Sequence, residues 1–325
     1  MMQRRQLLAW TGAGTLGALL GTPAQAQGYP AGPINVILPL QAGSASDVAV
    51  RHMAERLGNR MGTSCVVENV TGAAGLVGLE RLARARPDGR TVAALNNSIM
   101  TILPHLQAKN MKGDPRRDFV AVAGIANIPT FFAVAGDSPI QNVDDLVKHA
   151  KARRLNYSSG GVGSPQHLAT EMFKSYAGVD LTHVPYRGAS QAAMAVAAKE
   201  VDVMSMALSL ARPFLTDKRV RLIGYCGTER HAQYPDVPTL HEQGVANYDY
   251  SSWIGFFLPR DVPNETVSTL RKEAQAIAQD ADFQQQLVRA GLEPWPRSDA
   301  QLASIVNDDY QRWEKIIRDA NIQMS

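Results

Sequence analysis

The sequence predicts an α/β protein of two lobes with a ligand cleft between them. Segments with strand pattern alternate with segments of helical pattern along most of the chain, which favours layered α/β structure with mostly parallel strands. A unit of strand, glycine- and serine-rich loop, and helix occurs once in each half, at residues 34–61 and 155–177. Two lobes can turn these loops toward each other, so we expect both loops to border one cleft.

The first half of the chain predicts three strands and two helices. The strands are short apolar runs, and the first helix carries Val50, Met53 and Leu57 at helical spacing. Gly62 and the turn at 87–89 are suited to end the two helices. We expect strands at 34–38, 65–68 and 91–95, and helices at about 46–61 and 75–86.

The second half repeats this alternation. Asn142 and Ser164 are typical N-caps, Pro165 suits a first helical position, and Gly178 suits a helix end. The tail from Pro263 onward is expected to be helical. We expect strands at 131–134, 155–157, 182–186, 201–204 and 220–223.

Residues 1–26 have the pattern of a secretory signal peptide. Arg4 and Arg5 precede an apolar run at 7–20, and an A-x-A cleavage signal places the start of the mature chain at Gln27. The run is too short for a stable membrane span. Paired arginines are compatible with Sec or twin-arginine export. We therefore expect a periplasmic protein.

Charge and cysteine content exclude several classes of function. The formal net charge is +3, or +1 without Arg4 and Arg5, and no lysine and arginine cluster suggests nucleic-acid binding. Cysteine and histidine spacing supports no metal site. Cys65 and Cys226 lie in apolar runs, and both a disulfide and two buried thiols fit that setting.

The two glycine- and serine-rich loops carry the chemistry expected of an anion clamp. The first spans 39–47 and the second spans 158–166, each leading into a helix. A helix N-terminus offers unpaired N–H groups and the positive end of the helix dipole. Taken singly, Ser46 caps a helix and Gly43 turns the chain as readily as they bind a ligand. Two equivalent loops favour binding of one anion.

Motifs for nucleotide binding or serine hydrolysis are incomplete in this sequence. Gly72, Gly75 and Gly78 lack the spacing and the following acid of a dinucleotide fingerprint, and no phosphate-binding P-loop occurs. A secreted serine hydrolase that uses Ser164 or Ser44 with His167 is the alternative, although no serine lies in a G-x-S-x-G elbow.

The order of several short segments is specific to one family. Besides the first loop, these segments are 29–33, 67–69, 72–75, 85–89, 156–160, 183–188, 236–239 and 252–255. Together they resemble the extracytoplasmic receptors of tripartite tricarboxylate transporters, also called the Bug family. The resemblance implies a type II periplasmic-binding-protein-like fold, a ligand held between two lobes, no catalytic residues and no cofactor.

The resemblance also implies a site. The loops 40–47 and 158–166 would hold one ligand carboxylate, with Asn97, Ser98 and Tyr186 as pocket walls. The expected ligand-binding residues are Leu40, Gln41, Ala42, Gly43, Ser44, Ser46, Asp47, Asn97, Ser98, Ser158, Ser159, Gly160, Gly163, Ser164, Gln166, His167, Tyr186, Ser205 and Ala207.

The chain departs from the family pattern where the distal end of the ligand should lie. Gln41 and Ser44 stand where proline and glycine are frequent, and Ser205, Met206 and Ala207 replace a more polar stretch. Met204 and Met206 could line an apolar pocket or belong to the core.

The lobes and partners follow from the same resemblance. We expect the first lobe to comprise residues 27–125 and 230–325, and the second lobe residues 126–229. The expected partner is a small carboxylate (a dicarboxylate, an aromatic acid or an amino acid), delivered by a monomeric receptor to membrane permease subunits or presented to a sensor.

Overall fold

The structure, a computed structural model, describes residues 29–319 and 322–323; the expected signal peptide lies outside these residues. Its first lobe is built on a six-stranded sheet of order β11-β4-β10-β3-β1-β2. The strands are β1 (Ile34–Leu38), β2 (Cys65–Asn69), β3 (Thr91–Asn96), β4 (Phe119–Asn127), β10 (Trp253–Pro259) and β11 (Glu293–Arg297). The helices are α1 (Ala45–Met61), α2 (Leu76–Ala83), α3 (Leu103–Leu106), α4 (Pro115–Asp118), α9 (Asn264–Ala278), α10 (Ala281–Arg289) and α11 (Asp299–Asp319), with short turns η1 (Ala73–Gly75) and η2 (Ser98–Ile102).

Helices cover both faces of this sheet because its strands are apolar on both sides. Val36 packs in a cluster with residues of α1, α9 and α10, whereas its neighbour Ile37 packs in a cluster with residues of α2 and α11. This alternation is the period of two that a strand imposes on its side chains. The first lobe is therefore a three-layered α/β unit, with α1 and α2 on opposite faces of β1.

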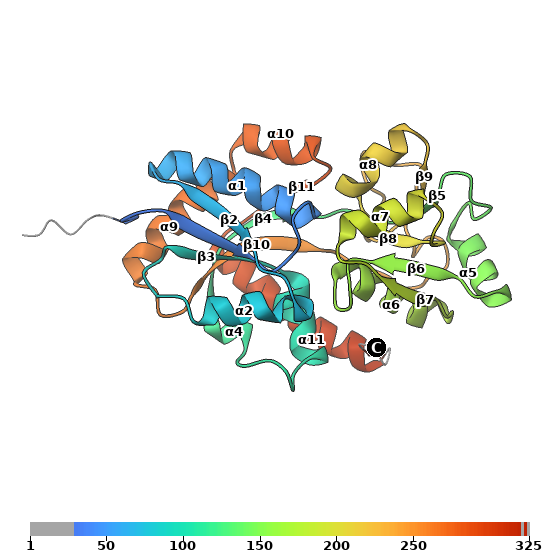
Figure 1. Ribbon diagram of the computed structural model, residues 1–325, viewed down its shortest axis with the longest axis horizontal. Coiled ribbons are helices and arrows are strands. Elements are labelled where there is room, and N and C mark those ends of the chain that lie inside the picture. The colour runs from blue at the N-terminus through green and yellow to red at the C-terminus, as the bar shows by residue number, and fades with distance from the viewer. Residues whose placement is uncertain (1–28, 320–321, 324–325) are drawn as a thin grey trace, which may run out of the picture.

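The second lobe is smaller and lies beside the first (Figure 1). Its sheets have the orders β8-β5-β9 and β6-β7, and a bridge between Tyr157 and Val203 connects the two. The strands are β5 (Thr130–Ala135), β6 (Asn156–Ser159), β7 (Thr182–Pro185), β8 (Met204–Ala207) and β9 (Val220–Tyr225). The helices are α5 (Val143–Ala152), α6 (Pro165–Ala177), α7 (Ala189–Ala197) and α8 (Leu208–Thr216).

The caps predicted at Asn142 and Ser164 and the helix ends predicted at Gly62 and Gly178 are confirmed, whereas α1 is capped by Ser44 and not by Ser46, and α2 ends at Ala83, before the turn at 87–89. The Oγ atoms of Ser44 and Ser164 accept from the third N–H group of α1 and α6, and Asn142 caps α5 in the same way. Gly62 and Gly178 end α1 and α6 at φ of +64° and +61°, a conformation that glycine adopts without strain.

The expectation of mostly parallel strands is wrong. Of the eight strand pairings in the described part, three are parallel and five are antiparallel. The chain crosses between the lobes twice, from β4 to β5 and from β9 to β10. The returning strand β10 therefore enters its sheet from the opposite end and runs antiparallel to both β3 and β4.

The structure also bears on the strand expected at 201–204 and on the lobe assignment of segment 230–252. The strand expected at 201–204 begins later, at Met204, and only Val203 before it forms a bridge. Segment 230–252, expected in the first lobe, contributes Leu240, Val245 and Tyr248 to a cluster with Phe132 of β5, and the same cluster also includes Trp313 and Ile316 of α11, so the expected lobe boundaries stay a prediction.

The two cysteines are free: Cys65 is partly buried on β2, and Cys226 is buried after β9. Among the described residues, no helix combines the length and the apolar character needed to cross a membrane.

Candidate functional site

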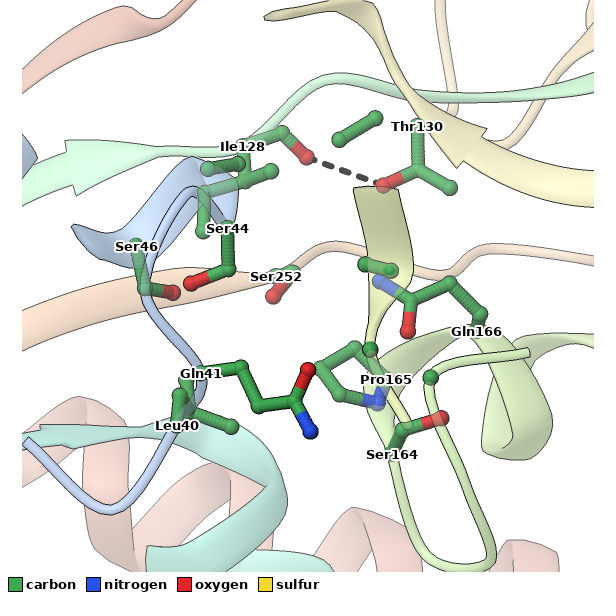
Figure 2. A pocket seen from close by; sticks show the side chains of 15 residues that line it. Leu40, Gln41, Ser44, Ser46, Ile128, Thr130, Ser164, Pro165, Gln166 and Ser252 are labelled. Carbon is green, nitrogen blue, oxygen red and sulfur yellow. Dashed lines mark hydrogen bonds between the residues drawn. The ribbon is translucent and has the colours of Figure 1, made fainter. Parts of the chain in front are cut away.

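A cavity of about 60 Å³ lies between the lobes, where the predicted loops meet (Figure 2). We call it the inner cavity. The first lobe contributes its β1–α1 loop, and the second contributes the β6–α6 loop, the start of α7 and the end of β8. Both connections between the lobes also reach the cavity. Its lining residues are Leu40, Gln41, Ser44, Ala45, Ser46, Ile128, Thr130, Gly160, Ser164, Pro165, Gln166, Gly188, Ala189, Ala207 and Ser252.

Four helices begin at this inner cavity. The N-cap residues of α1, α6, α7 and α8 are Ser44, Ser164, Gly188 and Ala207, and all four line the cavity. The serine caps occupy the third N–H group of α1 and α6. In the described part, the earlier N–H groups of Ala45, Ser46 and Gln166 have no protein acceptor. Donors of this kind suit an anion.

The polar lining is neutral. It consists of hydroxyl groups, amide groups and backbone, and none of the described lining residues is charged. In this neutral lining, the helix N-termini are the groups that offer partial positive charge to a ligand. Several preorganised N–H groups can hold a carboxylate without a cationic side chain, since each charge-assisted hydrogen bond contributes about 1.5–3 kcal/mol.

Asp47 fixes the first loop from behind. Its side chain is 5% exposed and accepts from the Gly43 N–H, from Arg51 Nε and from Asn69 Nδ2, each at 2.9 Å. Burial alone would raise the pKa of this carboxyl, but the hydrogen bonds and the charge of Arg51 lower it overall. Asn69 also donates to the carbonyl of Leu40 at 3.0 Å. Asp47 is thus a positioning residue.

Two histidines, the buried His167 and the partly buried His183, support the second loop. The N–H of Gly163, a residue at φ of +76°, donates to His167 Nδ1 at 3.3 Å, and Ser159 Oγ lies 2.6 Å from His183 Nε2. The two imidazole centroids are 4.5 Å apart. Burial, with a smaller effect of His183, lowers the pKa of His167 to about 4. His167, in the first turn of α6, is therefore neutral near pH 7 and accepts a hydrogen bond from the loop.

The lobes touch across the inner cavity. The side chain of Gln41 points from the first lobe toward the second (Figure 2) and lies against Gly188. A Cβ atom on Gly188 would stand 1.6 Å from Gln41 Oε1. Nearby, Ser190 Oγ donates to the carbonyl of Gly43 at 3.0 Å. Because these contacts join the two lobes, the cleft is closed in this structure.

A second, larger cavity of about 470 Å³ adjoins the first. We call it the outer cavity. It shares Leu40, Gln41, Gly160, Ser164 and Pro165 with the inner one. Its other lining residues are Pro39, Thr71, Gly72, Ala73, Ala74, Gly75, Ser98, Ile99, Gly161, Val162, Gly163 and Arg187.

A family model described as the tripartite tricarboxylate transporter family receptor matches residues 49–322. The chain belongs to this family. A UPF0065 protein of Bordetella pertussis is 30% identical over 309 residues, which is 94% of each chain. Protein BugT of the same species is 25% identical and covers 99% of this chain and 100% of its own.

Solved structures agree in fold. The Rpa4515 protein of R. palustris, solved with adipate, has a TM-score of 0.85 at 29% identity, covering 91% of this chain and 99% of its own. MatC of Rhodopseudomonas palustris, with bound malate, has a TM-score of 0.83 at 26% identity, covering 89% of this chain and 100% of its own. The two-lobed binding-protein fold and the family expected from the sequence are confirmed, and these relatives are receptors.

The structure brings ten of the nineteen expected site residues of this receptor to the cavities. Leu40, Gln41, Ser44, Ser46, Gly160, Ser164, Gln166 and Ala207 line the inner cavity, and Ser98 and Gly163 line only the outer one.

Nine expected residues line neither cavity. They are Ala42, Gly43, Asp47, Asn97, Ser158, Ser159, His167, Tyr186 and Ser205.

Most of these nine have other partners. Asn97 holds the connection before β10 through Ser251 and Ser252. Ser158 Oγ donates to the Ala192 carbonyl, and the Tyr186 hydroxyl donates to Glu200. These side chains therefore bind other protein groups and do not line either cavity.

Other lining residues were missed by sequence reasoning. Ile128, Thr130 and Ser252 lie on the crossings between the lobes, and Gly188 and Ala189 begin α7. Gly188 and Ser252 lie in the family-specific segments 183–188 and 252–255, a signal that could have found them, whereas no local pattern marks Ile128, Thr130 and Ala189, which reach the cavity only through the tertiary fold. Met204 and Met206 pack in the core of the second lobe with Phe131, which settles their role as core residues.

The serine-hydrolase alternative finds no support in the hydrogen bonds. Ser164 Oγ accepts from the backbone N–H of His167, whose imidazole Nδ1 accepts from Gly163. His167 Nε2 is buried and meets no partner in the described part of the chain. The imidazole is therefore not directed at the serine as a base.

Proposed function

We propose that this receptor captures a small carboxylate-bearing molecule in the inner cavity and encloses it by closure of the two lobes. The observation that carries the proposal is the convergence of four helix N-termini on a cavity with neutral lining. Such a site favours a negative charge and can complete the coordination of a carboxylate with backbone N–H groups.

The structural relatives support this ligand class. One was solved with adipate and another with malate, both of which are carboxylates. These two proteins are 29% and 26% identical to this chain over about nine tenths of its length, which supports a similar mode of binding.

The same proposal includes a place of action. We infer export to the periplasm by a cleavable signal peptide over residues 1–26, through Sec or the twin-arginine route. The captured solute would then be delivered to the permease subunits of a tripartite tricarboxylate transporter or presented to a sensor.

Thermal unfolding of the mature chain tests the ligand class. Dicarboxylates, aromatic acids and amino acids are screened alongside the matching amides, which keep the shape but lack the charge. A carboxylate at 100 times its Kd should stabilise the protein by about 2.7 kcal/mol, and its amide should not. Small-angle scattering should show whether the ligand compacts the protein. Equal effects of acid and amide, or no effect of any acid, would refute the proposal.

A further inference from the structure

The outer cavity has features of a second ligand compartment. It adjoins the inner cavity along five shared residues and is lined by both lobes. At about 470 Å³ it can hold a substantial part of a small molecule that begins in the inner cavity.

Arg187 gives this compartment a charge. In the described part of the chain it is the one charged residue that lines either cavity. Its side chain is exposed and has no hydrogen bond or ion pair to any described residue. The guanidinium group presents planar, paired donors that match a carboxylate. It is therefore free to meet an anion in the outer cavity.

The first lobe supplies another part of the wall of this compartment. Ser98 belongs to that wall and is 2% exposed, and its Oγ lies beside the buried hydroxyl of Tyr250, a residue that lines neither cavity. Ala73 and Ala74, which line the cavity, have φ of +45° and +59°. Non-glycine residues are rare in this region, and such strain concentrates at ligand-binding sites.

We propose that the outer cavity is a second anion subsite and that Arg187 is its specificity-determining residue. This inference rests on the proposed function: the helix ends hold one carboxylate, and Arg187 binds a second anionic group at the other end of the same molecule. The receptor would then select dicarboxylates over monocarboxylates of the same chain length, because only the former place a charge beside Arg187.

Matched pairs of acids test this subsite. The mature chain is titrated by calorimetry with succinate and butyrate, adipate and hexanoate, and suberate and octanoate. The variants are Arg187→Gln, which removes the charge, and Arg187→Lys, which keeps the charge but loses the planar donor pair. The control is Arg154→Gln. Arg154 is exposed, has no side-chain partner in the described structure, and precedes β6 at the end opposite its cleft-facing loop.

The wild type should bind at least one diacid more tightly than its monoacid. Arg187→Gln should weaken that diacid about tenfold, the lower end for a charged hydrogen bond because Arg187 is exposed, and should leave the monoacid unchanged. Arg187→Lys should lose less, and Arg154→Gln should change neither acid. Equal losses for both acids, no loss, or tighter binding of the monoacid would overturn the subsite. If none of the six acids binds to the wild type, the second anion subsite is overturned, whereas carboxylate capture fails only if the aromatic acids and amino acids of the thermal screen also have no effect.

Discussion

Replacing Gly188 with alanine should impair closure of the cleft. Gly188 has φ of −174° and ψ of 163°, an extended conformation that alanine adopts freely, so the backbone is not strained. The effect comes from the new methyl group, which would stand 1.6 Å from Gln41 Oε1 and 2.7 Å from Gln41 Cδ. Because Gln41 belongs to the other lobe, either its side chain must move or the lobes must stay further apart.

The cost can be estimated from this geometry. Non-bonded heavy atoms prefer separations of about 3.5–4.0 Å, so the Gln41 amide must move by roughly 2 Å. Overpacking of a core typically costs about 1–3 kcal/mol, and the lower end applies here because Gln41 Oε1 is the end of a flexible, partly exposed side chain. Since opening the cleft removes the clash, the cost should fall on ligand binding: the Kd should rise about fivefold, while the thermal midpoint without ligand should change little.

A double-mutant cycle separates this cause from others. Calorimetry with the best-binding acid would compare wild type, Gly188→Ala, Gln41→Ala and the double variant. In the Gln41→Ala background the methyl group has no clash, so Gly188→Ala should then change the Kd by less than about threefold. If Gly188→Ala weakens binding equally in both backgrounds, contact with Gln41 is not the reason and the closure argument is wrong.

Three further predictions concern the supports of the site. Asp47→Ala removes the acceptor shared by Gly43, Arg51 and Asn69, so urea unfolding should show a loss of about 2–4 kcal/mol together with weaker ligand binding; unchanged values for both would refute its positioning role. His167 has a folded pKa of about 4, below its ordinary 6.5, so the unfolded state binds the extra proton and stability should fall as pH drops from about 6.5 to 4, by up to about 3 kcal/mol. In His167→Gln that fall should be smaller in urea unfolding across this range, and an identical pH profile would contradict the prediction. Gly160→Ala places a methyl group 2.9 Å from the backbone nitrogen of Ala189, which should block a donor of α7 and weaken acid binding at least about tenfold in calorimetry; wild-type affinity would count against α7 as part of the site.

Local signals were sufficient to predict much of this receptor. Asn142 and Ser164 cap helices because their side chains accept from nearby N–H groups, and Gly62 and Gly178 end helices because glycine tolerates positive φ. These interactions span only a few residues of the chain, so a sequence pattern can reveal them. The pairing of the two loops is not local, and it is expected because the same loop pattern occurs in each half and because the chain resembles a known family.

Features set by distant parts of the chain could not be predicted in this way. Gly188 is adjacent to Gln41 only after the lobes close, although 147 residues separate the two. The direction of β10 depends on where the chain crosses back from the second lobe, which no strand pattern encodes. His167 and Asp47 resemble ligand contacts in sequence because they lie in the right loops, yet their side chains point to the backbone behind those loops.

The neutral lining of the inner cavity has a consequence for how such receptors diversify. In the proposed binding mode, negative charge is held by main-chain N–H groups at helix starts, such as those of Ala45, Ser46 and Gln166, and a side-chain replacement does not delete a main-chain donor. Substitutions at Leu40, Ile128 or Thr130 would therefore reshape the space around the solute while the capacity to hold an acid persists. A scaffold of this kind would allow a few wall positions to change which acid is accepted, without rebuilding the helix starts that recognise the common carboxylate.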